Sequence, residues 1–273
     1  MKDALARLLR LAAALLVAGA LGACASIPPG AGSNPADPWE VYNRHVFDLN
    51  DRLDRAVMRP VAEAYEKVLP EPVRICINNA FRNLGEPINA VNNLLQGKPV
   101  RALLDLCRFA VNSTMGLLGC FDIATTGGLA PRSNEDFGQT LGRWGAGPGP
   151  YFVLPLLGPS TVRDTLGRLV DFLGTDLLWY LNDIRLRNSL VGLRLVDTRA
   201  GLLPAERVLD TAAIDRYQFV RDAFLQLRRN LVYDGDPPRL EDPYEDFDDD
   251  PEPPDGAGTP AGAAGQPKGG AGP

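Results

Sequence analysis

A single histidine and four cysteines among 273 residues leave little material for a catalytic or metal site. The cysteines lack the spacing of metal ligands, and His45 is the only imidazole. The chain has no G-x-S-x-G nucleophile elbow, so a hydrolase would have to use Ser113 or Ser160 without a marked base. Hydrolysis by one of these serines stays an alternative, which a fully functional His45→Ala variant would remove. We predict a protein that is not an enzyme and needs no cofactor or metal.

Long apolar runs are also absent. Residues 109–129 and 166–186 come closest, but aspartates interrupt both segments. A conventional membrane-spanning helix needs about 20 mainly apolar residues. We expect these segments to be interfacial helices, with Trp179 and Tyr180 at headgroup depth, and keep ordinary core packing as the alternative.

Alternating runs of β-branched residues are absent as well, which argues against a sheet. Prolines instead precede apolar residues at helical spacing. Asp37 is predicted to cap a first helix, with Glu40 completing a capping box, and Pro60 to end it and begin the next. Further helices are expected from Pro70-Glu71-Pro72 to Leu84, from Glu86-Pro87 to Gly97, from Pro99 onward, and through Tyr217–Leu231. The fold class is therefore all-α, with a single helical domain.

The first residues have the pattern of a lipoprotein signal. A basic region precedes the apolar segment 11–21, and the sequence LGAC places small residues before Cys24. We predict a signal peptide over 1–23, acylation of Cys24, and a tether over 24–36. Ala25 instead of an acidic residue favours delivery to the outer membrane of a Gram-negative cell. A secreted protein with a chance cysteine is the alternative.

Charge separates the body from the C-terminal tail. From Asp234 onward eleven acidic residues face two basic ones, a net charge of −9, whereas residues 24–233 carry +1. The acidic, Pro/Gly/Ala-rich segment 234–273 cannot bury enough apolar surface to offset its ordering entropy. We expect a disordered tail, which is either a solvated spacer or a recruiter of a basic partner, after a helical domain over 37–233.

Three cysteines other than Cys24 follow the signal region, so at most one disulfide can form among them. They are Cys76, Cys107 and Cys120. Cys76 and Cys107 lie on helices expected to be neighbours, and this pair is the first guess.

The most informative segment combines glycines and prolines with an apolar stretch. Gly145, Gly147 and Gly149 are predicted to form a hinge, and residues 151–157 (YFVLPLL) the apolar tip of a hairpin or lid that contacts lipid or lines a passage for it. Ser160 is expected to cap a helix from Thr161. The candidate channel residues are Gly145, Gly147, Gly149, Tyr151, Phe152, Val153, Leu154, Leu156 and Leu157.

The body resembles the MlaA/VacJ family of outer-membrane phospholipid-transport lipoproteins over nearly all of residues 37–233. The resemblance rests on an ordered series of short motifs: DPWE at 37–40, RPVA at 59–62, PEPVR at 70–74, NLGEP at 83–87, VNNLLQG at 91–97, DFGQTLG at 136–142 and GPS at 158–160. The cysteines and the long acidic tail depart from the family pattern.

The resemblance implies a helical, ring-like body embedded in the inner leaflet of the outer membrane, with an amphipathic channel. Such proteins associate with trimeric porins and pass stray phospholipids to a soluble periplasmic carrier of the Mla type; no nucleic acid is expected. Arg108, Arg163 and Asn92 are candidate headgroup contacts, although an internal ion pair and helix capping are alternatives. A porin-associated structural lipoprotein without transport is the alternative function.

Overall fold

The computed structural model describes residues 31–174 and 176–239. The predicted signal peptide, Cys24, residues 25–30 of the tether and residues 240–273 of the tail lie outside the described residues. The chain divides into a unit that ends at Pro237 and a second unit that begins at Pro238. The fold below is that of the first unit.

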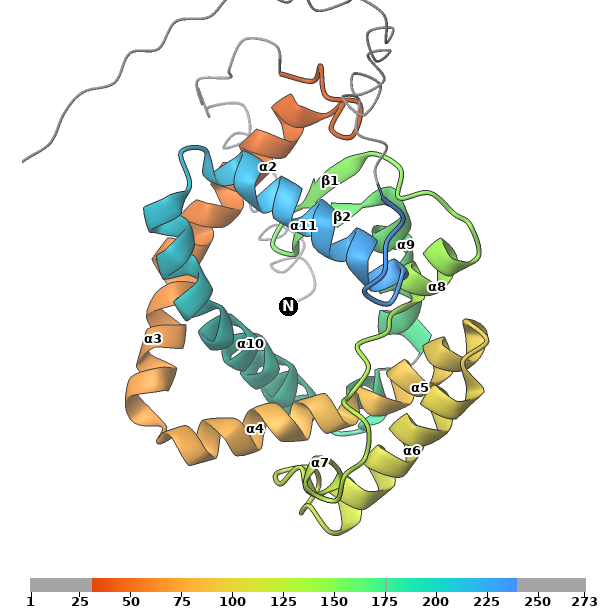
Figure 1. Ribbon diagram of the computed structural model, residues 1–273. Helices are drawn as coiled ribbons and strands as arrows, with labels where there is room; N and C mark the ends of the chain where they lie inside the picture. The colour runs from red at the N-terminus through yellow and green to blue at the C-terminus, as the bar shows by residue number, and fades with distance from the viewer. Residues whose placement is uncertain (1–30, 175, 240–273) are drawn as a thin grey trace, which may run out of the picture. The chain divides into compact units, whose positions relative to one another are not determined.

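Helices and one β-hairpin make up this unit (Figure 1). In chain order the elements are α2 (Glu40–Leu53), η1 (Asp54–Met58), α3 (Arg59–Val68), α4 (Glu71–Leu84), α5 (Glu86–Leu95), α6 (Pro99–Thr114), α7 (Ile123–Thr126), α8 (Phe137–Arg143), β1 (Tyr151–Leu154), β2 (Gly158–Thr161), α9 (Val162–Gly174), η2 (Leu177–Tyr180), α10 (Ile184–Ala212) and α11 (Arg216–Val232). The predicted all-α class is confirmed, with one two-stranded sheet added to it.

Proline sets several helix starts as predicted. α4, α5 and α6 each have proline in the first two helical positions, where the missing N–H costs no intrahelical hydrogen bond. Gly97 follows α5 with φ +77°, a backbone conformation that favours glycine after a helix. The last predicted helix is present as α11, with Asp215 accepting from Gln218 N at its start.

Pro60 lies in the first turn of the next helix as predicted, but the first helix ends earlier than predicted, at Leu53. Because Pro60 has no N–H, the carbonyl of Ala56 lacks its ordinary helical partner. The helix widens there into the π-helical turn η1, and Pro60 lies in the first turn of α3, which continues directly.

The start of the first helix also differs from the prediction. α2 begins at Glu40, and Asp37 is not its N-cap. Asp37 is fully buried, where it accepts hydrogen bonds from the Asn43 side chain and from the hydroxyl of Tyr217. The Glu40 side chain accepts from Gly32 N. Distant partners therefore outweigh the local capping pattern.

The elements pack in a closed circuit. α2 runs through η1 into α3, α10 packs on both α3 and α4, and α4 leads to α5. α5 contacts α8, α8 contacts α11, and α11 contacts the hairpin, whose β1 packs on α2 (Figure 1). Two small apolar clusters stabilise the circuit: Val46, Tyr151, Val153 and Tyr217 at the hairpin, and Ala62, Tyr65, Ala200 and Leu203 between α3 and α10.

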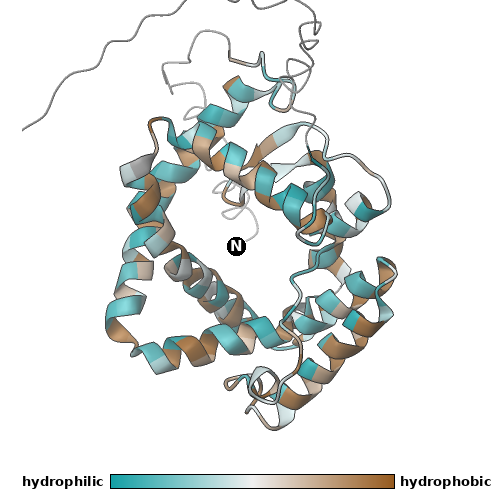
Figure 2. Ribbon diagram, in the orientation of Figure 1, coloured by the Kyte–Doolittle hydropathy of each residue, from teal (hydrophilic) through white to brown (hydrophobic). Residues whose placement is uncertain are grey.

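Three helices bury polar residues and expose apolar ones. α6 buries Asp105, Arg108 and Asn112, whereas Leu103 and Leu106 are exposed. α5 and α9 follow the same rule, and Figure 2 shows hydrophilic and hydrophobic bands alternating along the helices. A helix in water is expected to have the opposite arrangement. This inversion favours apolar surroundings over the core-packing alternative.

The two long apolar segments, which are expected to be interfacial helices, are each divided among several elements. The first covers the end of α6, a loop and α7, and the second covers most of α9, then η2 and the start of α10. In the loop after α6, Leu117 and Leu118 have positive φ values of 50° and 59° and are exposed. Within the described residues no helix combines the length and apolar character needed to cross a bilayer.

The disulfide joins Cys76 to Cys120, and Cys107 is free and exposed. The first guess, Cys76 with Cys107, is therefore wrong. Cys107 lies on the exposed side of α6, whereas the loop after α6 brings Cys120 to α4, where Asn79 Nδ2 donates to its carbonyl oxygen.

Candidate functional site

The hairpin predicted around residues 151–157 is present as β1 and β2. The strands are antiparallel, with Tyr151 opposite Thr161 and Leu154 opposite Gly158. Tyr151 and Val153 are fully buried, so contact of these two residues with lipid stays a prediction. Pro155, Leu156 and Leu157, at the turn, are exposed, the two leucines at 76% and 67%. Ser160 lies in β2 and does not cap α9; Thr161 Oγ1 instead accepts from Asp164 N.

Two asparagines of α2 attach the hairpin to this helix. Asn43 Nδ2 donates to the carbonyl of Tyr151 and its Oδ1 accepts from Val153 N, at 3.1 and 2.9 Å. About two helical turns further along α2, Asn50 Nδ2 donates to Leu154 O and Asn50 Oδ1 accepts from Leu156 N, at 2.9 and 2.8 Å. The base and the turn of the hairpin are thus held by separate side chains.

The predicted glycine hinge precedes the hairpin. Gly145 and Gly149 have φ of +94° and +67°, which L-residues rarely adopt, so glycine is required at both positions. Gly147 has open space around its Cβ position. The loop is attached on its far side, because Arg163 N donates to Pro148 O and Val162 N to Pro150 O.

A cavity of about 730 Å³ lies between α2, the hairpin turn, α10 and α11. Its wall is mainly apolar and includes Leu156 and Leu157 of the turn, Leu209 of α10, and Phe224 and Leu227 of α11. Its volume is within the range of about 300–1,000 Å³ that is typical of small-molecule sites. The two exposed leucines of the predicted hairpin tip therefore line this cavity.

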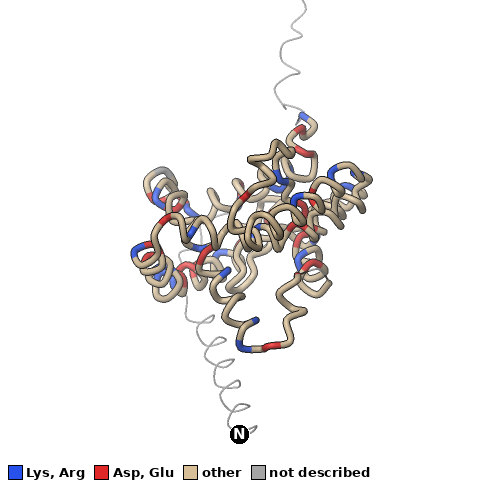
Figure 3. The backbone as a smooth tube through the Cα atoms, turned by 90° about the horizontal axis from the view of Figure 1, so that it is seen from below, with Lys and Arg blue, Asp and Glu red and all other residues tan. Residues whose placement is uncertain are grey.

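One side of the cavity is charged. The Arg199 guanidinium donates to both carboxylate oxygens of Asp54, at 2.6 Å each, and to Glu206. Arg216 lies 3.6 Å from Asp51 and 3.7 Å from Glu206. The hydrogen bond to Asp54, together with that to Glu206, raises the pKa of Arg199. The rim carries both signs, since Asp51, Asp54, Glu206, Arg199 and Arg216 all line the cavity. Figure 3 shows basic and acidic residues close together at several places along the chain.

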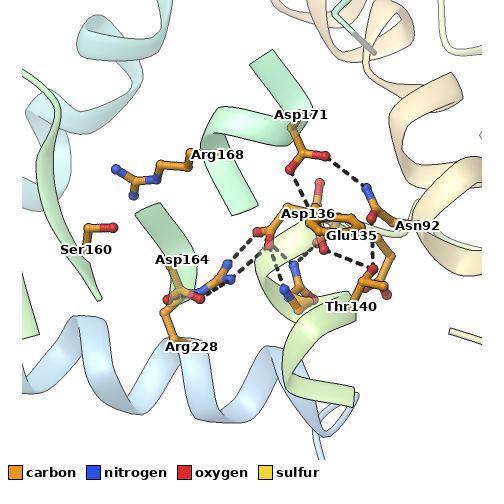
Figure 4. Close-up of polar contacts among 12 residues, drawn as sticks. Asn92, Glu135, Asp136, Thr140, Ser160, Asp164, Arg168, Asp171 and Arg228 are labelled. Carbon is orange, nitrogen blue, oxygen red and sulfur yellow. Dashed lines mark hydrogen bonds and ion pairs between the residues drawn. The ribbon is translucent and has the colours of Figure 1, made fainter. Parts of the chain in front are cut away.

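A second polar cluster fixes α9 and α11 to the segment before α8 (Figure 4). Arg228 donates to Asp136 and to Asp164, and Asp136 also accepts from Gln139 N. Burial opposes ionisation of Asp136, but the hydrogen bonds and charge of Arg228 outweigh burial and lower its pKa. Asp171 lies nearby and accepts from Asn92 Nδ2; burial is the main cause of its raised pKa.

None of the three predicted headgroup residues lines the large cavity; Arg163 and Asn92 each bond to a member of the polar cluster around Asp136, whereas Arg108 lies elsewhere on α6. Arg108 is buried on α6 and donates to Asp122 and Thr125. Arg163 donates to the neighbouring carboxylate of Asp164 and lines a smaller cavity of about 420 Å³ beside the glycine loop. Asn92 is buried in the Asp171 cluster. These contacts match the structural alternative, and the headgroup role of the three residues stays a prediction.

Sequence reasoning missed the charged rim and both asparagine attachments. Arg199 and Glu206 belong to α10, in which no single apolar face marks a helix orientation, and Arg216 is the first residue of α11. The mixed pattern of α10 could have indicated its position, because α10 packs on α3 on one side and lines the cavity on another. Asn43 and Asn50 gave no local signal, since their partners lie more than 100 residues away.

The "MlaA lipoprotein" family model matches residues 35–231. The chain belongs to the MlaA lipoprotein family. It is 35% identical over 231 residues to the Intermembrane phospholipid transport system lipoprotein MlaA of Escherichia coli K12, covering 83% of this chain and 90% of the relative. An uncharacterized protein of Rickettsia conorii is 31% identical over 196 residues, covering 72% of this chain and 78% of the relative.

A solved structure extends this likeness to three dimensions. It comes from work on the structural basis for maintenance of bacterial outer membrane lipid asymmetry, and it matches with a TM-score of 0.63 and 36% identity. The match covers 72% of this chain and 98% of the solved chain. The MlaA resemblance predicted from the ordered motifs is confirmed.

Proposed function

We propose that this MlaA-family protein removes mislocalised phospholipids from the outer leaflet of the outer membrane and passes them towards the periplasm. The observation that carries the proposal is the 730 Å³ cavity, with an apolar wall and a charged rim. A phospholipid needs both surfaces, because its tails are apolar and its headgroup is charged. Transport relatives and a lipid-asymmetry structure support the same function.

In this function the tails pass along the wall of α10, α11 and Leu156–Leu157, and the headgroup follows the rim of Arg199, Asp54 and Glu206. A rim of both signs can exchange its internal ion pairs for contacts to a phosphate or an ammonium group. The chain's own residues supply the path, and the free energy comes from the asymmetric membrane or from removal of lipid downstream.

The body lies in the periplasmic leaflet of the outer membrane, with Cys24 acylated. The support is the exposed apolar surface of α5, α6 and α9, which hydrocarbon would cover favourably. A trimeric porin and a soluble periplasmic carrier of the Mla type are the proposed partners, and both follow from the family resemblance.

The proposed role is not catalytic. His45 contacts the Val41 carbonyl through Nδ1 at 2.6 Å, and Ser160 is buried beside Thr165. Ser113 Oγ accepts from Asn83 Nδ2. These separate environments give no support to a serine and histidine acting together.

The test is outer-leaflet phospholipid in a strain that lacks the gene, measured by palmitoylation of lipid A by the resident outer-membrane acyltransferase. Wild-type complementation should restore low palmitoylation. Ala223→Trp, which places an indole in the cavity, should not restore it. Ala110→Trp on exposed α6 is the matched control and should behave as wild type. If Ala223→Trp complements fully, the proposal that lipid passes through this cavity is wrong, and the alternative of a structural lipoprotein without transport is favoured.

The Gly145–Gly149 hinge is a further part of the proposal. Gly147→Pro should stiffen the loop and raise palmitoylation without unfolding the domain, because its Cβ position is open. Gly147→Ala, which fits the same space, should complement. Normal lipid A in the proline strain would rule out the hinge.

A further inference from the structure

A second apolar depression lies outside the transport cavity. This groove, of about 450 Å³, is lined by Trp39, Tyr42, Phe152, Val162, Thr165 and Leu166. The lining contains no charged residue, and its polar groups are the hydroxyls of Tyr42 and Thr165 and the indole N–H of Trp39. Its residues come from the start of α2, from β1 and from the start of α9, so it lies at the hairpin edge of the body.

The groove is built around Phe152. Tyr151 and Val153 point into the core, and Phe152 therefore faces the other side of β1. Its ring stacks on Tyr42 with centroids 5.7 Å apart and meets the edge of Trp39 at 5.9 Å. Trp39, Tyr42 and Leu166 are nevertheless 44–55% exposed. The site is thus preformed, and its apolar surface lacks a cover among the described residues.

The end of the chain that leads to Cys24 is attached beside this groove. Gly32 N donates to Glu40 Oε2 at 3.1 Å, and the carbonyl of Ala36 accepts from Tyr151 N at 2.8 Å. Asp37 is fully buried against Asn43. Residues 32–37 are therefore fixed to α2 and β1, which supply Tyr42 and Phe152 of the groove; Trp39 directly precedes α2.

Only residues 25–31 separate Gly32, where this attached segment begins, from the acylation point at Cys24. Seven residues span at most about 25 Å, at roughly 3.5 Å per residue. An acyl chain on Cys24 consequently starts within reach of the hairpin edge. Its hydrocarbon matches the groove's mainly apolar lining, which holds no charged residue to pair with a phosphate or a charged side chain.

We propose that the groove binds one acyl chain carried by Cys24 of the same protein. This inference rests on the acylation included in the proposed function. A lipoprotein anchor on a free tether leaves its body free to rotate, whereas an anchor chain seated at Trp39, Tyr42 and Phe152 fixes which edge of the body lies against the hydrocarbon. The groove then orients the transport cavity and does not itself conduct lipid.

Photo-crosslinking in the full-length protein, in its own outer membrane, tests the assignment. p-Benzoylphenylalanine replaces Tyr42 in one strain and Leu166 in another, on opposite sides of the groove. The matched control replaces Leu94, an exposed apolar residue of α5. After irradiation, mass spectrometry of peptides should show the N-terminal lipopeptide joined through its acyl chain to position 42 or 166 and not to position 94.

Other products overturn the proposal. A free phospholipid or a porin peptide at positions 42 and 166 would mean that a membrane lipid or a partner occupies the groove, and the absence of any adduct would mean that it is empty. The mass of the N-terminal peptide that has not been crosslinked would show directly whether Cys24 is acylated. Lipid A palmitoylation in the same strains tests transport separately, so a failed crosslink with normal palmitoylation removes only the groove assignment.

Discussion

Arg228 on α11 donates two hydrogen bonds to Asp164 at the start of α9, with Nε 2.9 Å from Oδ2 and Nη2 3.0 Å from Oδ1. The Asp164 side chain is 3% exposed and the Arg228 side chain 11%. Such a paired fork depends on the planar guanidinium, which a lysine cannot reproduce. The pair therefore joins the C-terminal helix to the helix that follows the hairpin.

Arg228→Lys should lower the free energy of unfolding by about 2–3 kcal/mol, because the charge remains but the fork is lost. Arg207→Lys, at an exposed position of α10, should change it by less than about 0.5 kcal/mol. Chemical denaturation of the purified protein in detergent measures both. Equal stability of the two variants would show that the buried fork contributes no more than a surface arginine.

Asp136 provides a pH dependence with a defined sign. Its pKa is below the 3.8 of a free aspartate, since the interactions with Arg228 outweigh burial. The folded protein thus binds this proton less tightly than the unfolded chain does. The stabilisation is fully present above pH 3.8 and is lost as pH falls through the lower, folded-state pKa. Asp136→Asn should flatten the loss of stability between about pH 5 and pH 2, measured by denaturation across this range. A profile parallel to the wild type would contradict the assignment.

The features that could be predicted best from the sequence are those that depend only on residues adjacent in the chain. Proline fixes φ within its own residue, so the starts of α4, α5 and α6 could be read directly. Asp37 has an equally good local capping pattern, but its carboxylate instead accepts a hydrogen bond from the hydroxyl of Tyr217, 180 residues away. The ordered motifs predicted the family, whereas the cavity depends on how α10 and α11 meet the hairpin turn. No local pattern encodes that meeting.

The disulfide pairing, too, could not be predicted from local sequence. Helix adjacency suggested Cys76 with Cys107, yet neighbouring helices bring together only the faces that meet, and Cys107 is on the exposed face of α6. The Cys76–Cys120 bridge closes a loop of 44 residues, for which chain entropy gives a stabilisation of about 4 kcal/mol. Cys120→Ser should lower the free energy of unfolding by up to about this amount. Cys107→Ser should leave it unchanged, and thermal unfolding of the two variants compares them. A greater loss in Cys107→Ser would overturn the pairing.

The two asparagines of α2 predict separable effects on the hairpin. Asn43 is fully buried among Asp37, Tyr151 and Val153, so Asn43→Ala leaves buried polar groups unpaired and should destabilise the whole domain by about 2–3 kcal/mol. Asn50 holds only the turn, where Leu156 is 76% exposed. Asn50→Ala should therefore speed amide hydrogen exchange at residues 154–158 and leave global unfolding within about 1 kcal/mol of wild type. Hydrogen exchange read by mass spectrometry, with denaturation beside it, measures both effects. If Asn50→Ala instead accelerates exchange equally in β1, α9 and α11, the turn is not an independent unit, and the cavity wall it forms moves only with the domain.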